Sequence, residues 1–163
     1  MTKLLFVCMG NICRSPLAEG IFLNLAAESG QRDRYEVDSA GIGDWHVGHE
    51  PDPRSQAVAN THGITLTCRA RQIVSPDDFE NFDLLLAMDR QNFRDLIHLS
   101  PAEHHGKIRL MREFDPEGGA DHEVPDPYYG GPKGFDTMYV MLHRSCVNLI
   151  EALKRDDVRA TSG

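Results

Sequence analysis

Hydrophobic residues along the chain form short runs, typical of buried strands, separated by stretches with helical spacing. Residues 4–7 are an apolar run that stops before Gly10, as expected of a strand covered on both faces. Residues 35–40 alternate like a second strand, residues 82–88 are strongly apolar, and residues 107–111 are a candidate fourth strand. The pattern therefore predicts a sheet built from short strands spread along the chain.

Helices are predicted between these strands. Pro16 suits the first turn of a helix, and apolar residues recur at helical spacing from there until Gly30 ends the pattern. Residues 54–61 and 91–97 are predicted as two further helices, and residues 138–153 as the last. Because strands that alternate with helices form right-handed crossovers, we predict an α/β fold with a parallel sheet covered on both sides.

The length and the loops favour one domain. Residues 41–53 and 115–133 are predicted loops rich in Gly and Pro, and neither has the composition of a linker between domains. A chain of 163 residues is the usual size for a single hydrophobic core. We therefore predict one domain at residues 1–155, followed by a frayed polar tail at residues 156–163.

Charge and cysteine content exclude several classes of protein. With 17 basic against 25 acidic side chains, the net charge of −8 argues against general nucleic-acid binding. The first apolar run is too short for a secretory signal, and no run approaches the ~20 residues of a membrane span. The cysteines form no CxxC pair and resemble neither a disulfide framework nor a zinc site: Cys8, Cys13, Cys68 and Cys146. We expect a cytoplasmic monomer with no membrane partner, metal or cofactor.

The most informative stretch, residues 8–16, reads Cys-Met-Gly-Asn-Ile-Cys-Arg-Ser-Pro and joins the first predicted strand to the first predicted helix. In an open α/β sheet, ligands bind beyond the carboxyl ends of the strands. A helix N-terminus at that place offers free N–H groups and a positive dipole, which favour an anion. Gly10 and Asn11 tolerate positive φ, so the loop can turn its amides inward. The stretch predicts an anion-binding loop.

Three side chains of this stretch suit phosphate chemistry. The positive field of the loop favours the thiolate of Cys8, which is the nucleophilic form of cysteine. Arg14 supplies a planar fork that matches two phosphate oxygens, and its spacing from Cys8 lets the chain encircle one tetrahedral oxyanion. Ser15 can hydrogen-bond the sulfur and stabilise it as a leaving group. These features indicate covalent phosphate transfer through Cys8.

This stretch resembles the signature of the low-molecular-weight protein-tyrosine phosphatases, and the resemblance extends over nearly the whole chain. Further blocks of the family's order are residues 38–41, 44–48, 51–54, 62–64, 70–72, 88–89 and 126–130. The resemblance implies a three-layer αβα sandwich with a four-stranded parallel sheet. It also implies hydrolysis of phosphotyrosine and aryl phosphates through a cysteinyl-phosphate intermediate, with tyrosine-phosphorylated proteins as partners.

The resemblance also implies roles for individual residues. Cys8 would be the nucleophile, Arg14 the phosphate clamp and Asp126 the general acid. The phosphate cradle would be formed by the backbone amides of Met9, Gly10, Asn11, Ile12, Cys13 and Arg14. In the family a Ser and a His hold the loop Asn in a left-handed conformation, and those positions match Ser39 and His62. Asp126 also suits the chemistry, because the departing phenolic oxygen needs a proton and the attacking water needs a base.

Other residues near these blocks have predicted roles that are less direct. The rings of Trp45, Tyr128 and Tyr129 would wall a slot deep enough for a phenyl phosphate and too deep for phosphoserine. Cys13 is the expected redox partner of Cys8, since the resemblance supports a disulfide that protects the nucleophile from over-oxidation. Asp89 is interpreted as a helix N-cap rather than as a contact of the site.

The same residues bear on three rival functions. An arsenate reductase on this scaffold needs further cysteines on a mobile segment, and Cys68 and Cys146 lie in predicted structured regions. A related subfamily hydrolyses phosphoarginine and tends to have Thr at the position of Ile12. An inactive phosphotyrosine-binding module should have lost one of the catalytic residues, and all are present. The sequence favours phosphotyrosine hydrolysis over these alternatives.

Overall fold

Parallel strands form the centre of the structure, a computed structural model that describes residues 1–127 and 131–155. The strands β1 (Thr2–Cys8), β2 (Tyr35–Gly41), β3 (Leu84–Ala87) and β4 (Ile108–Leu110) form one four-stranded sheet. Their order is β2-β1-β3-β4, and all neighbours run parallel. The central strand β1 ends at Cys8, opposite Gly41 of β2. The carboxyl end of the sheet therefore receives the loop that follows Cys8.

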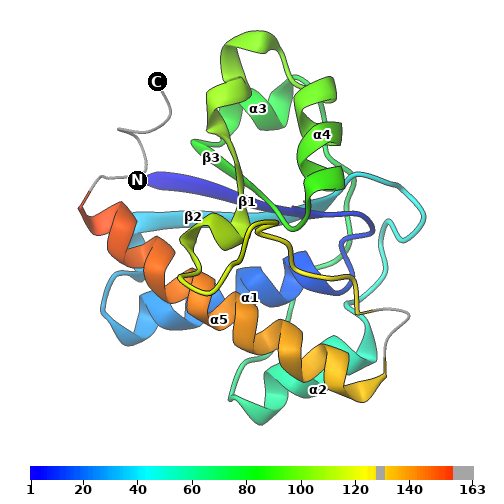
Figure 1. The fold of residues 1–163 in the computed structure, drawn as a ribbon, viewed down its shortest axis with the longest axis vertical. Helices are drawn as coiled ribbons and strands as arrows, with labels where there is room; N and C mark the ends of the chain where they lie inside the picture. The colour runs from blue at the N-terminus through cyan, green and yellow to red at the C-terminus, as the bar shows by residue number, and fades with distance from the viewer. Residues whose placement is uncertain (128–130, 156–163) are drawn as a thin grey trace.

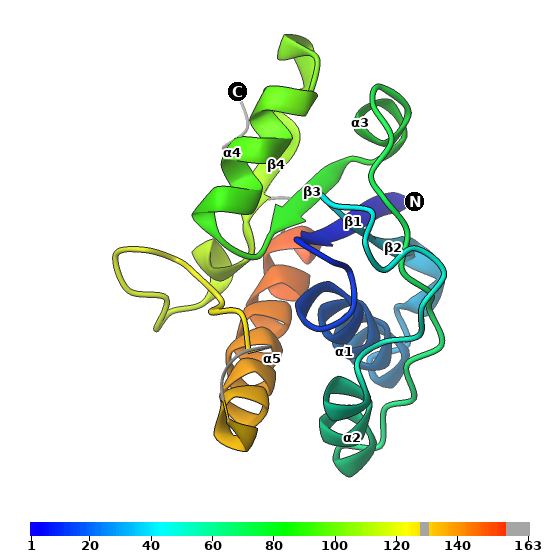
Figure 2. The ribbon, with the colours of Figure 1, turned by 90° about the vertical axis from the view of Figure 1, so that its right-hand side faces the viewer.

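Helices cover both faces of this sheet. On one face lie α1 (Arg14–Glu28), α2 (Pro53–Thr61) and α5 (Pro132–Lys154), and on the other lie α3 (Asp77–Asn81) and α4 (Arg90–Leu99) (Figures 1 and 2). Short 3₁₀ turns complete the chain: η1 (Arg32–Arg34), η2 (Ala102–Lys107) and η3 (Met111–Phe114). The predicted three-layer αβα sandwich with a four-stranded parallel sheet is confirmed.

The apolar run of β1 is continuous because the strand is buried on both faces. Leu4 and Phe6 belong to the core under α1, α2 and α5, whereas Leu5 and Val7 belong to the core under α3 and α4. All four side chains are fully buried. A strand between two helical layers has no polar face, and that absence of alternation is the signal that the sequence carried.

The structure differs from the predicted helices in two places. The last helix begins at Pro132 instead of residue 138, because Pro at the first turn loses no helical hydrogen bond and has a helix-compatible φ. The Gly- and Pro-rich composition of this segment had indicated a loop. The helix α3 (Asp77–Asn81) was not predicted, since its length is too short for a periodic pattern. The tail at residues 156–163 lies outside the described residues.

No helix in residues 1–127 and 131–155 is both long and apolar enough to cross a lipid bilayer.

Replacing Leu86 by Ala should test the packing of the core between the sheet and the helices α1, α2 and α5. Leu86 is fully buried in β3, so its truncation is expected to lower the free energy of unfolding by about 2–5 kcal/mol. The matched control is Val140→Ala on α5, where the side chain is 51% exposed and the change should stay within about 0.5 kcal/mol. Urea unfolding measures both. Equal stabilities of the two variants would contradict the packing described here.

Candidate active site

The loop between β1 and α1 turns its carbonyl groups away from the pocket. The carbonyl of Cys8 accepts from the N–H of Ile42 at 3.0 Å, and that of Met9 accepts from Gly43 at 2.9 Å. The carbonyl of Ile12 accepts from the N–H of Asp52 at 2.8 Å. A trans peptide points its N–H opposite to its C=O, so the amides that follow these carbonyls face the other side of the loop. That side is suited to an anion.

Asn11 fixes the curvature of the loop and the orientation of its hydrogen bonds. It is held in the left-handed region at φ 57°, as its tolerance of positive φ had suggested. Its side-chain oxygen accepts from the backbone N–H of Arg71 at 3.0 Å, and its Nδ2 donates to Ser15 Oγ at 2.7 Å. Asn11 is almost fully buried, so these bonds are shielded from water.

The sulfur of Cys8 receives the end of this hydrogen-bond chain. Ser15 Oγ lies 3.0 Å from Cys8 Sγ. Since the Ser15 oxygen already accepts from Asn11, its own hydrogen is available for donation to the sulfur. A donor at this position can stabilise negative charge that develops on the sulfur.

Arg14 is a buried charge with three partners from distant segments. Its side chain is only 3% exposed, and Nη1 donates to Asp89 Oδ2 at 2.7 Å and to the carbonyl of Val124 at 2.9 Å. Nη2 lies 3.7 Å from Asp126 Oδ2. Burial alone would lower the pKa of Arg14, but the negative charges of Cys8, Asp89 and Asp126 raise it above its ordinary value. The guanidinium therefore stays charged.

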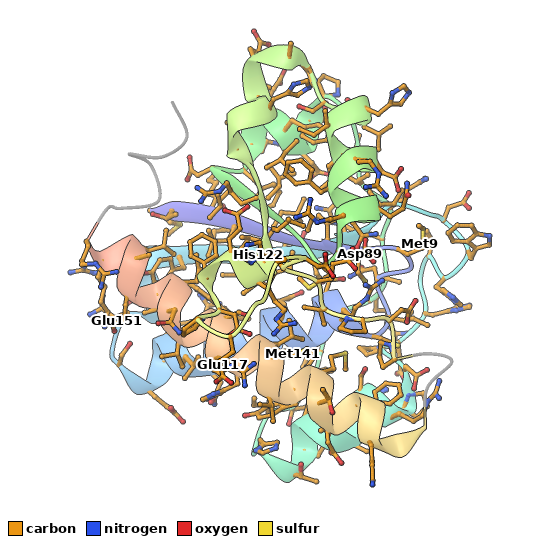
Figure 3. All side chains as sticks on the ribbon, in the orientation of Figure 1. Met9, Asp89, Glu117, His122, Met141 and Glu151 are labelled. Atoms are coloured by element: carbon orange, nitrogen blue, oxygen red, sulfur yellow. The ribbon has the colours of Figure 1, made fainter. Side chains whose placement is uncertain are left out.

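Asp89 has two functions, of which only one was predicted. Its Oδ1 accepts from the N–H of Asn92 at 2.7 Å, which is the expected N-cap of α4. Its other oxygen binds Arg14, a contact that the sequence interpretation had ranked below capping. Asp89 and Met9 are labelled in Figure 3, near the carboxyl end of the sheet. A single carboxylate thus links the start of α4 to the site.

Cys8, Arg14 and Asp126 line one pocket with a volume of about 370 Å³. Its lining residues are Cys8, Met9, Gly10, Ile12, Cys13, Arg14, Trp45, His46 and Asp126. Trp45 is 67% exposed and packs on Gly43, where any Cβ would overlap the indole ring. A Cβ on Gly10 would lie 2.9 Å from Cδ2 of His46, so this glycine permits the close approach of the imidazole. The predicted slot residues Tyr128 and Tyr129 lie outside the described residues.

Ser39 and His62 have other partners than the resemblance implied. The hydroxyl of Ser39 donates to Glu19 Oε1 at 2.6 Å, and the ring of His62 stacks on Tyr139 with centroids 3.7 Å apart. The side chain of Asn11 is held by Ser15 and by the Arg71 amide instead. This is a correction to the predicted loop support: a sequence match identified the block but not which side chains meet.

Glu19 and Cys68, both half-buried, form a polar cluster with the buried Ser39 that the sequence did not predict. Burial raises the pKa of Glu19 to about 7, although hydrogen bonds from Ser39 and Cys68 and the charge of Arg71 oppose the shift. Burial likewise raises the pKa of Cys68 to about 11, with the charge of Glu19 adding to it. One signal was available in the sequence: Glu19 lies one helical turn after Ser15 and so on the same face of α1.

Cys13 lies in the same loop as Cys8 and is also buried. Burial raises the pKa of Cys13 to about 12, and the negative charges of Asp52 and Cys8 add to the effect. Cys13 is therefore a neutral thiol at physiological pH. The thiols of Cys8 and Cys13 are both free in this structure. Within residues 1–127 and 131–155, no three His, Cys, Asp or Glu side chains gather as metal ligands.

The fold and site together define an α/β protein that presents a cysteine and a buried arginine around a loop whose amides are suited to an anion. The family model for low molecular weight phosphotyrosine protein phosphatase matches residues 3–159. A putative low molecular weight protein-tyrosine-phosphatase of Synechocystis is 43% identical over 155 residues, which are 94% of this chain and 98% of the relative. The chain therefore belongs to the low-molecular-weight protein-tyrosine phosphatases, a family of hydrolases.

Solved structures agree with this assignment. A protein tyrosine phosphatase from Entamoeba histolytica, crystallised with Hepes in the active site, superposes with a TM-score of 0.92 at 39% identity. The match covers 96% of this chain and 99% of that one. The structure of a Drosophila arginine phosphatase superposes with a TM-score of 0.85 at 34% identity, covering 94% of this chain and 98% of that one.

The raised pKa of Glu19 predicts a pH-dependent stability. A carboxyl that binds its proton more tightly when folded contributes stability that is complete below about 4.5 and is lost as the pH rises through about 7. Between pH 5 and pH 8, the free energy of unfolding of Glu19→Gln should therefore rise relative to the unmodified protein by about 1–3 kcal/mol.

The control for this measurement is Glu36→Gln, which also removes one carboxyl but at an exposed position on β2, where water screens its pairing with Lys3 and the effect on stability should stay within about 0.5 kcal/mol. Urea unfolding at both pH values gives all three stabilities. A Glu19→Gln difference that is the same at pH 5 and pH 8 would mean that Glu19 titrates normally in the folded chain.

Proposed function

We propose that this chain hydrolyses phosphotyrosine through a phosphocysteine intermediate on Cys8. The observation that carries the proposal is the position of the Cys8 sulfur, 3.0 Å from the Ser15 hydroxyl, whose hydrogen is available because its oxygen accepts from Asn11. The same pocket contains the charged group of Arg14 and the carboxyl of Asp126. A nucleophile, an anion clamp and a proton donor thus face one space.

In the first step, the thiolate of Cys8 attacks phosphorus and the bond from phosphorus to the phenolic oxygen breaks. Asp126 gives its proton to that oxygen, so tyrosine leaves as a neutral phenol. Arg14 and the amides of Met9 to Arg14 carry the charge of the equatorial phosphoryl oxygens. Because Arg14 is already fixed by Asp89 and Val124, little reorganisation is needed as that charge shifts.

In the second step, water attacks phosphorus and the phosphorus–sulfur bond breaks. Asp126, now ionised, accepts a proton from the water. The Ser15 hydroxyl donates a hydrogen bond to the departing thiolate, which makes sulfur a better leaving group. Inorganic phosphate then leaves, and Cys8 and Asp126 return to their starting protonation states.

Phosphotyrosine is favoured over shorter phosphoamino acids because Cys8 lies at the base of a pocket with an aromatic wall. Cys8 is only 3% exposed, and Trp45 lines the same pocket from the loop after β2. A phenyl ring can pack against the indole while its phosphate reaches the sulfur. The contribution of Tyr128 and Tyr129 to this wall stays a prediction.

Phosphoarginine is the second candidate substrate, because a Drosophila arginine phosphatase shares this fold at 34% identity. Ile12 lines the pocket here and provides an apolar contact that suits an aryl group. The rate of phosphate release from phosphotyrosine and from phosphoarginine, measured side by side, separates the two. Arsenate reduction would need a thiol relay, and Cys146 is fully buried against the carbonyl of Ala18.

We infer that residues 1–155 act as one phosphatase domain, as a cytoplasmic monomer without metal, cofactor, membrane or nucleic-acid partner. The family implies phosphoprotein substrates. Capture of tyrosine-phosphorylated proteins from native cytosol with Cys8→Ser would identify them.

Substitution of the two reacting side chains tests the mechanism. Cys8→Ser should abolish turnover of para-nitrophenyl phosphate and of a phosphotyrosine peptide while retaining peptide binding, because the cradle remains. Asp126→Asn should lower kcat/KM for the peptide by about 10²–10⁴, the usual contribution of a general acid. Asp136→Asn, an exposed residue on α5, serves as the matched control. Residual activity in Cys8→Ser would rule out the covalent route.

Treatment with hydrogen peroxide tests the predicted Cys8–Cys13 pair. Peroxide oxidises the Cys8 thiolate to a sulfenic acid, and the Cys13 sulfur then attacks it, forming a disulfide and releasing water. Oxidation also neutralises Cys8, which removes part of the charge that raises the pKa of Cys13. We expect mass spectrometry to find the disulfide, with activity restored by dithiothreitol. Cys13→Ser should lose activity irreversibly; full recovery of this variant would contradict a protective disulfide.

A further inference from the structure

One buried arginine holds the chain at two points between η3 and Asp126. Arg112 lies in η3 and is 8% exposed. Its Nη2 donates to the carbonyl of Glu117 at 2.8 Å, and its Nη1 donates to the carbonyl of Glu123 at 2.7 Å. The loop projects from the body of the molecule in Figure 2, and Figure 3 labels Glu117 and His122 within it. Arg112 therefore connects the outgoing and the returning segments of this loop.

A fully buried carboxylate fixes the orientation of Arg112. Asp115 Oδ2 accepts from Arg112 Nε at 3.0 Å, and both Asp115 oxygens also accept from Arg144. Burial by itself would raise the pKa of Asp115, but hydrogen bonds from Arg144, from the Glu117 amide and from Arg112 outweigh it and bring the pKa to about 2. Asp115 is thus ionised, and its ion pair with Arg112 intact, at every pH well above 2.

The anchored end of the loop leads directly into the active site. The carbonyl that Arg112 holds belongs to Glu123, and the next residue is Val124. The N–H of Val124 donates to the carbonyl of Met88 at 2.8 Å, and its own carbonyl accepts from Arg14. Asp126 follows Val124 closely in the chain. Arg112 therefore holds the residue immediately before Val124, which Met88 and Arg14 fix at the edge of the site.

A second arginine contacts this loop, but at its exposed tip. Arg90 donates to the carbonyls of Ala120 and Asp121, each at 3.1 Å, from an exposed position. Hydrogen bonds in water contribute less than buried ones, because water competes for the same groups. Among the described residues, Arg112 is the buried side chain that binds backbone carbonyls on both sides of the loop.

We propose that Arg112 is a positioning residue for the acid–base step: by binding the carbonyls of Glu117 and Glu123, it sets the position of Asp126 at the pocket. This inference rests on the proposed function of Asp126. Arg112 lines no part of the pocket and acts through the loop backbone. It has no contact with the reacting groups, so its removal should affect proton transfer more than anion binding.

The leaving-group dependence of kcat/KM tests this inference. Arg112→Met should lower kcat/KM by about 10–100-fold for phosphotyrosine peptide and phenyl phosphate, whose phenols need a proton to depart. For 2,4-dinitrophenyl phosphate the loss should stay below about threefold, since that phenolate departs with little protonation. The inhibition constant of inorganic phosphate should stay within about threefold, because Asp89 still holds Arg14.

Matched variants separate an effect on the position of Asp126 from a general loss of fold stability. Arg144→Met also removes a partner of Asp115, but it leaves both loop carbonyls bound to Arg112, so its leaving-group profile should match that of the unmodified protein. Arg112→Lys keeps the charge but lacks the planar fork, and should give an intermediate slope. If Arg112→Met does not fold, as judged by urea unfolding, Arg112→Lys carries the test.

Asp126→Asn is the reference that separates this inference from the proposed function. If kcat/KM of Asp126→Asn depends on the leaving group no more steeply than that of the unmodified protein, the acid role is overturned, and the positioning role with it. If the dependence is steeper in Asp126→Asn but unchanged in both Arg112 variants, the positioning role alone is overturned. A uniform loss over all leaving groups with weakened phosphate inhibition would show that Arg112 only supports the fold.

Discussion

The arrangement of the site depends on keeping the charge of Arg14 buried at the carboxyl end of the sheet. A buried guanidinium without partners costs several kcal/mol, so the chain must bring acceptors to it. Asp89 comes from the turn after β3, and Val124 and Asp126 come from the loop before α5. Because all of them must meet α1 at its first residue, this one charge ties three distant segments together.

Backbone carbonyls of irregular segments also need donors around the site. The loop after β1 gives its carbonyls to the loop after β2, which leaves its amides for an anion. Arg112 takes up two carbonyls of the Asp126 loop, and Arg14 takes up a third from Val124. An irregular segment has no strand or helix to satisfy its polar groups, so buried arginines do so and fix its path.

Most of the fold could be predicted from the sequence, since it follows from local patterns. The unbroken apolar run of β1 reflects burial on both faces, and the helical spacing after Pro16 reflects one face of α1 against the sheet. The start of α5 at Pro132 and the short α3 were missed, because composition and short length give no periodicity to read. Where a pattern is local and long enough, the sequence is sufficient.

The site likewise has a part that could be predicted from local sequence and a part that depends on contacts between distant segments. The sequence by itself determined the segment from Cys8 to Arg14, because its chemistry lies within one strand, loop and helix N-terminus. Only the tertiary structure decided that Asp89 binds Arg14, that the Arg71 amide holds Asn11, and that Ser39 pairs with Glu19. Hydrogen bonds reach about 3 Å, and segments far apart in sequence come within that reach only through the crossings of the chain.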